Sequence, residues 1–222
     1  MGMSPLEPED IRLEESFLDA ESLLRQWGYT QGAEPFLGRW ECRNPWGIPG
    51  PLYVGDDDSC GTGPEAAPNN VYLHLQGASP GGEFLFRQPS TTYELRQVVE
   101  AAQINVVSEY SCDGNARWTP VTVAAWWESI QPVREQLRET LSRHVTNIRR
   151  LTAVQPSGVW PDTYKAEWAR VQESWPPAAL RRWLDYLDHG AETYLRRYAF
   201  FLSTGRVPAL DEPALPELRS WR

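Results

Sequence analysis

Residues 54–71 gather carboxylates, a thiol and turn-forming residues in one short stretch, VGDDDSCGTGPEAAPNNV. Asp56, Asp58 and Cys60 begin like an acidic calcium-binding loop, in which oxygen ligands at alternate positions reach one cation. The pattern then ends, because a thiol is a poor ligand for a hard cation and Ala67 stands where a bidentate glutamate belongs. The same residues also suit a plain connection, since Asp and Asn side chains bond to their own backbone in turns. The sequence therefore predicts no metal site, and Asp56, Asp58 and Cys60 are the weak candidates for one.

The cysteines do not form a recognisable reactive or metal-binding pattern. Cys42, Cys60 and Cys112 lack the short spacing of a zinc knuckle, so we expect free thiols. Cys60 and His74 are close enough in sequence to suggest a thiol–imidazole pair for nucleophilic catalysis. The neighbouring carboxylates oppose that role, because they raise the pKa of a thiol and the thiolate is the reactive form. No catalytic constellation is complete, so the sequence favours a protein without catalysis and without a cofactor.

Tryptophan is unusually frequent, with 11 among 222 residues. Trp40 and Trp46 lie in a stretch rich in glycine and proline, which leads through Tyr53 to the acidic residues 56–58. Loop aromatics beside carboxylates are suited to stacking on a sugar, a base or a cation. They are equally suited to anchoring a protein interface, or to pinning down a loop that has no regular ladder. Ligand, partner and structural roles all stay open for these residues.

The charge is negative overall and unevenly distributed. The net charge is −9; residues 1–120 carry 18 acidic and 7 basic side chains, whereas residues 121–222 carry 12 and 14. An acidic half repels the phosphates of nucleic acid and attracts a basic protein, although solubility alone also accounts for such a charge. One lysine against 20 arginines indicates a GC-rich, bacterial genome. The chain has no long apolar run and no secretory signal, so we expect a soluble, cytoplasmic protein that does not contact membranes.

The elements that must position these residues are helices around a small sheet. Apolar spacing of three and four predicts helices over 14–27, 92–103, 120–151, 162–174 and 176–203. We expect Pro132 to kink or split the third, and Gly190 to interrupt the last at a cost of about 1 kcal/mol. Short β-prone pieces occupy 36–42, 52–54, 71–75 and 83–87, and the turn-rich link between the last two predicts a hairpin.

This layout predicts an α+β protein, with a small antiparallel sheet and helices in the N-terminal half and long helices in the C-terminal half. We expect a mixed domain over 1–151, a helical hairpin over 152–203 that packs on it or continues it, and a Pro-rich tail over 204–222. The tail is expected to be extended and to dock through Trp221.

The favoured function is binding of a basic partner protein, as an inhibitor, an immunity-type factor or an assembly subunit. The surface predicted for that partner combines Trp40, Trp46, Tyr53, Asp56, Asp57 and Asp58. The alternative is a small-molecule or carbohydrate site, with or without catalysis, in the same region over 40–87. Its polar lining would come from Asp56, Asp58, Cys60, Asn70, His74 and Glu83, and Arg87 is a further candidate for binding.

Overall fold

The structure is a computed structural model that describes residues 16–55, 61–74, 82–153, 177–209, 212 and 215–221. The chain divides into two compact units, Met1–Trp118 and Thr119–Arg222. The described strands all lie in the N-terminal unit, and the described part of the C-terminal unit is helical apart from its tail, which confirms the α+β class. The predicted boundary near residues 152–160 falls largely outside the described residues, and the division predicted there stays a prediction.

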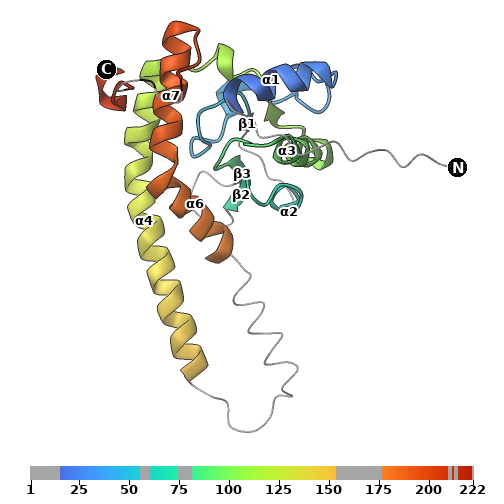
Figure 1. The fold of residues 1–222 in the computed structure, drawn as a ribbon. Helices are drawn as coiled ribbons and strands as arrows, with labels where there is room; N and C mark the ends of the chain where they lie inside the picture. Colours follow the sequence, from blue (N-terminus) through green and yellow to red (C-terminus); the bar gives the residue numbers. More distant parts are fainter. Residues whose placement is uncertain are drawn as a thin grey trace, which may run out of the picture. The chain divides into compact units, whose positions relative to one another are not determined.

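The N-terminal unit surrounds two short antiparallel strand pairs with helices (Figure 1). The strand β2 pairs with β3, which confirms that the two predicted hairpin segments are antiparallel partners, and β1 pairs with β4. The bounds of the elements are α1 (Ser16–Gln26), η1 (Trp40–Cys42), β1 (Tyr53–Val54), α2 (Gly63–Ala66), β2 (Val71–His74), β3 (Gly82–Leu85), α3 (Thr92–Ile104), β4 (Tyr110–Ser111) and η2 (Gly114–Ala116).

The helix α3 matches the predicted range closely, because its N-terminal cap and its apolar face are both specified by residues within or next to the helix itself. The hydroxyl of Thr91 accepts the N–H of Glu94 at 3.1 Å and so caps the first turn. Leu95, Val98 and Ala102 are buried, as the spacing of the apolar residues predicts. The core that they join includes residues from α1, from both strand pairs and from the connecting segments: Ala20, Leu24, Phe36, Leu52, Val54, Val71, Leu85 and Tyr110.

The segment 36–42 is not the regular strand that the sequence predicts. Phe36 makes only isolated bridges, to Ala33 and Glu109, and residues 40–42 form the short helix η1. Gly38 lies close to the backbone of Glu109, so that a Cβ added at Gly38 would be 2.3 Å from the Glu109 carbonyl oxygen. Conversely, β4 forms in a segment for which we predicted no strand, because its ladder is supplied by Tyr53–Val54, far away in the sequence.

The segment between η1 and β1 is held by one buried amide, that of Gln88. Its Nε2 donates to the carbonyl oxygens of Leu52 (2.7 Å) and Ile48 (3.3 Å), and its Oε1 accepts the N–H of Leu52. An added Cβ at Gly50 would lie 2.4 Å from the Gln88 side chain, so glycine is required for this approach. The Gly- and Pro-rich stretch is therefore fixed by a distant glutamine as well as by its own aromatic residues.

The C-terminal unit consists of α4 (Pro120–Ala153), α6 (Pro177–His189), α7 (Ala191–Thr204) and the short η3 (Leu218–Trp221). The helices α6 and α7 lie along α4, and η3 packs against α4 and α7 (Figure 1). The predicted stripe of the last helix is buried at Leu180, Trp183, Leu187, Leu195 and Tyr198. The predicted helix over 162–174 lies outside the described residues.

The predicted split of the long helix at Pro132 is wrong, whereas the predicted kink there stays a prediction. The helix α4 continues through Pro132, and in the turn before it the side chains of Ser129 and Gln131 donate to the carbonyls of Trp126 (2.8 Å) and Trp127 (2.9 Å). The predicted interruption at Gly190 is confirmed, because this residue separates α6 from α7.

The tail is held by arginines of α7 that donate to its backbone. The side chain of Arg196 donates to the carbonyls of Leu215 and Pro216, and that of Arg197 to Pro208. Leu218 is buried, whereas Trp221 is half-buried. Among the described helices, none is both long and apolar enough to cross a membrane.

Candidate functional site

Trp40 belongs to a cluster of perpendicular aromatic rings. Its ring centroid lies 5.4 Å from that of Tyr53 and 5.0 Å from that of Trp118, and both pairs are edge-to-face. The guanidinium of Arg43 covers the Trp40 ring at 4.1 Å from its centroid and approaches Trp118 at 5.2 Å. Burial lowers the pKa of Arg43, and no carboxylate among the described residues forms an ion pair with it. Its guanidinium is therefore held by two ring faces and by the Trp40 carbonyl, to which Nη1 donates at 3.4 Å, an arrangement that sequence reasoning missed.

Tyr53 lies inside this cluster and is buried, not presented to solvent. Its hydroxyl donates to Asp113 Oδ1 at 2.7 Å, and Asp113 also accepts from Arg117 Nε at 2.9 Å. Burial raises the pKa of Tyr53 above its usual value. The tyrosine therefore acts in the structure as a neutral, internal hydrogen-bond donor.

Trp46, the second loop tryptophan, is half-buried and packs edge-to-face on Phe84 with centroids 6.0 Å apart. Its backbone N–H donates to Asn44 Oδ1 at 3.0 Å. Asn44 also donates from Nδ2 to the carbonyl of Glu83 at 3.4 Å, so this turn is tied to β3. Trp40 and Trp46 thus have ring partners in the core, and their predicted role in binding stays a prediction.

Glu83 is a completely buried carboxylate. Its Oε1 accepts the N–H of Gly63 at 2.9 Å, and its Oε2 accepts the hydroxyl of Tyr110 at 3.1 Å. A Cβ at Gly63 would lie 2.3 Å from Oε2, so the contact requires glycine. Asn70 is equally buried; its Nδ2 donates to the Arg87 carbonyl at 3.2 Å, and its Oδ1 has no hydrogen-bond partner within the described part of the chain.

Arg87 forms an ion pair with Glu94. Glu94 lies in the first turn of α3, after the cap residue Thr91. Its Nε also donates to the carbonyl of Asn69 at 3.2 Å. Glu94 is buried and accepts the N–H (2.7 Å) and the hydroxyl (2.9 Å) of Ser90. These charges stabilise the start of the helix, and no ligand is needed to explain them.

The acidic candidates Asp56, Asp57 and Asp58, with Cys60, lie outside the described residues. His74 is described by its backbone, as the last residue of β2 opposite Gly82, and its side chain lies outside the described part. Within the described ranges, no group of three or more His, Cys, Asp or Glu side chains could hold a metal ion.

Exposed aliphatic side chains lie at the end of α3 and just after it, and the sequence analysis missed them. Ile104, Val106 and Val107 are exposed, with Val106 79% exposed, and the exposed Leu37 follows Phe36, which bridges to Glu109. We call these four residues the aliphatic turn. The apolar run Ile-Asn-Val-Val at a helix end was the available signal, but burial and exposure of such a run cannot be distinguished from its letters alone.

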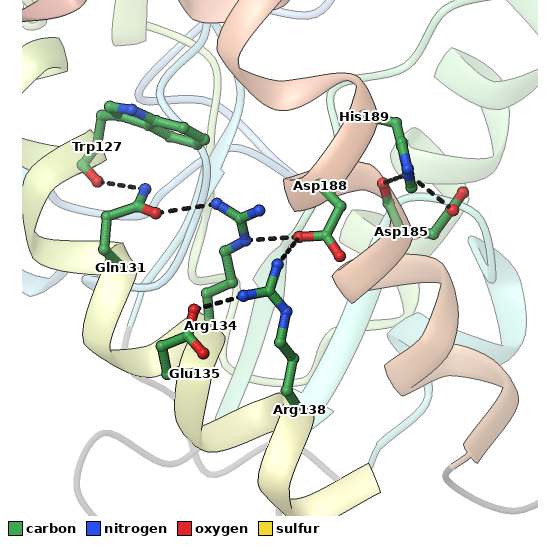
Figure 2. Close-up of polar contacts among 8 residues, drawn as sticks. All are labelled: Trp127, Gln131, Arg134, Glu135, Arg138, Asp185, Asp188 and His189. Carbon is green, nitrogen blue, oxygen red and sulfur yellow. Dashed lines mark hydrogen bonds and ion pairs between the residues drawn. The ribbon is translucent and has the colours of Figure 1, made fainter. Parts of the chain in front are cut away.

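An ion-pair network joins α4 to α6 in the C-terminal unit (Figure 2). Asp188 Oδ1 accepts from Arg134 Nε at 2.5 Å and from Arg138 at 2.7 Å. Gln131 and Glu135 hold the two guanidinium groups from the α4 side. All of these charges are balanced within the network, so it acts as a clamp between two helices.

No protein-family model, no curated protein and no solved structure matches this chain. The candidate site is therefore defined by the contacts of its own residues.

Proposed function

We propose that this protein binds a basic partner protein through its N-terminal unit, without catalysing a reaction. The observation that carries the proposal is the coincidence of charge and apolar exposure in that unit. Residues 1–120 have 18 acidic and 7 basic side chains, and the same unit exposes the aliphatic turn. Concentrated negative charge accelerates encounter with a basic protein, and exposed aliphatic side chains then provide short-range attraction.

The polar residues predicted to line a small-molecule or catalytic site favour protein binding over catalysis, because they are engaged in internal contacts. Tyr53, Glu83 and Arg87 all have internal partners, and each partner has a structural role at a turn, a strand or a helix start. A group that is already bonded inside the core is poorly placed to exchange protons with a substrate. Binding by surface complementarity makes no such demand on these residues.

The proposal is tested by capture from a lysate of the source organism, with the tagged full-length chain as bait. We expect one stoichiometric, basic protein that is retained at low ionic strength and released at high ionic strength, because exposed charges are screened by salt. Recovery of the chain alone at low salt contradicts the proposal.

A matched pair of variants tests the role of charge. Glu34 and Glu100 are exposed in the N-terminal unit, and Glu139 and Glu192 are exposed in the C-terminal unit. The double variant E34Q/E100Q is expected to slow association with the captured protein, whereas E139Q/E192Q, which removes the same charge elsewhere, leaves the rate unchanged. Equal effects of the two would indicate a general charge effect with no preferred unit.

A further inference from the structure

The aliphatic turn is a preformed surface, because its backbone is fixed from within. Asn105 is buried, and its Oδ1 accepts the N–H groups of Val107 (3.2 Å) and Glu109 (3.3 Å). The N–H of Ser108 donates to the Asn105 carbonyl at 3.2 Å. These bonds hold the backbone on both sides of Val106, so the exposed valines are presented by an ordered turn.

The turn also contains a strained residue. Ser108 has φ +52°, in the left-handed region that non-glycine residues rarely adopt. Its hydroxyl donates to Glu34 Oε2 at 3.4 Å, and this bond links the turn to the segment that contains Leu37. Strain of this kind persists only where the surroundings enforce it, and it occurs often at binding surfaces.

Carboxylates flank the aliphatic turn in sequence and in space. Glu100 lies one helical turn before Ile104, and the side chain of Glu34 accepts a hydrogen bond from Ser108. Glu109 follows Ser108 but is not part of this rim, because its Oε2 is buried and an added Cβ at Gly55 would lie 2.4 Å from it. Within the segments 34–39 and 100–109, the two exposed carboxylates of Glu34 and Glu100 outnumber the one basic side chain, that of Arg39. An apolar centre with a charged rim is the usual composition of a protein interface.

From these observations we infer that the aliphatic turn is the docking surface for a protein segment that presents aliphatic side chains flanked by arginine or lysine. The inference rests on the proposed function and deepens it, since it locates the interface away from Trp40, Trp46 and Tyr53, whose rings pack inward. Aliphatic side chains of the partner would cover Val106 and Val107, and its cations would face Glu34 and Glu100. A second copy of the chain fits this surface poorly, because the same carboxylates would then face one another.

The probe is a library of randomised peptides displayed on phage, selected against the full-length chain. We expect enriched peptides that combine aliphatic residues with arginine or lysine. V106E is expected to weaken the binding of a synthetic enriched peptide by about tenfold or more, as for a residue at the centre of an interface. V121E is the matched control, because Val121 is 55% exposed and lies in the C-terminal unit; it leaves the affinity unchanged.

Four outcomes would overturn the inference. If the selected peptides bind V106E as tightly as the unmodified chain, the docking surface lies elsewhere. If the selection yields no peptides that combine aliphatic and basic residues, the stated chemistry of the partner is wrong. A concentration-dependent dimer in analytical ultracentrifugation that V106E abolishes assigns the surface to self-association. If a basic protein captured from the lysate binds V106E and the unmodified chain equally, the proposed function stands and only the docking surface is wrong.

Discussion

The guanidinium of Arg43 stacks on the indole ring of Trp40, 4.1 Å from the ring centroid. The same guanidinium lies 5.2 Å from the ring centroid of Trp118, so it contacts two tryptophans that are themselves perpendicular. A cation over an aromatic face is attracted by the ring quadrupole, and the attraction grows when water is excluded. Arg43 therefore contributes to the order of the loop that contains η1.

The variant R43A is expected to lower the free energy of unfolding by about 1–2 kcal/mol, because it removes a partly desolvated cation–π contact. Urea denaturation followed by tryptophan fluorescence measures this change. R39A is the control, since Arg39 is exposed and has no ring contact among the described residues. Equal midpoints for the two variants would argue that the stacking adds nothing to stability.

The variant E83Q is expected to destabilise the N-terminal unit by about 1–3 kcal/mol, because one of its two buried hydrogen bonds loses its acceptor. Thermal unfolding gives the measurement, and the variant Y110F separates the two bonds by removing the donor to Oε2. E100Q, at an exposed glutamate of α3, should lie within about 0.5 kcal/mol of the unmodified chain. If E83Q is as neutral as E100Q, the buried carboxylate has no structural role.

The variant D188N is expected to destabilise the C-terminal unit by about 1–3 kcal/mol, because Arg134 and Arg138 lose the carboxylate that they share. The matched control is D185N on the same helix. The Asp188 side chain is 22% exposed, whereas that of Asp185 is 77% exposed beside His189, so the control should cost less than about 0.5 kcal/mol. Similar values for both variants, measured by chemical denaturation, would contradict the clamp between α4 and α6.

The thiol of Cys112 is expected to resist alkylation at neutral pH. Burial raises its pKa from 9.0 to about 12, with Asp113 as a further cause, so the thiolate is scarce until the pH approaches 12. In a C42S/C60S background, iodoacetamide should leave the folded chain unmodified at pH 8 and should modify it in denaturant. Rapid labelling of the folded chain at pH 8 would show that the thiol is accessible and that its pKa is not raised.

The same shift affects stability at high pH, and the sign follows from its direction. Because folding favours the protonated thiol, the contribution of Cys112 is fully present below pH 9 and is lost as the pH rises toward about 12. In C112A the fall in melting temperature over this interval should be smaller than in the unmodified chain. An identical slope in both proteins would contradict the shift.

The sequence predicted the elements whose signals are local. The cap at Thr91 and the apolar spacing of Leu95 to Ala102 specify α3 without any distant contact, and the alternating segments of β2 and β3 specify their pairing. The sequence did not decide whether Pro132 splits its helix, because the outcome depends on neighbouring side chains. At Pro132 the helix is continuous, and nearby side chains donate hydrogen bonds to carbonyl groups in the preceding turn. At Gly190 the chain forms two separate helices.

The candidate site was less accessible to sequence reasoning, because exposure is decided by residues far along the chain. Tyr53 and Glu83 look like binding residues in the sequence, yet Asp113 and Tyr110 bond to them from the strand β4 or just beyond it. Val106 and Val107 look like core residues, yet the buried Asn105 turns them outward.

By itself, the sequence determined the α+β class, the helices with clear periodicity and the acidic character of the N-terminal half. These follow from composition and from contacts within a few residues, which a sequence displays directly. Only the tertiary structure decided which polar groups are enclosed, which tryptophans have ring partners and which aliphatic side chains face water. The physical reason is that burial depends on the packing of segments distant in sequence, as where Arg43 lies between Trp40 and Trp118.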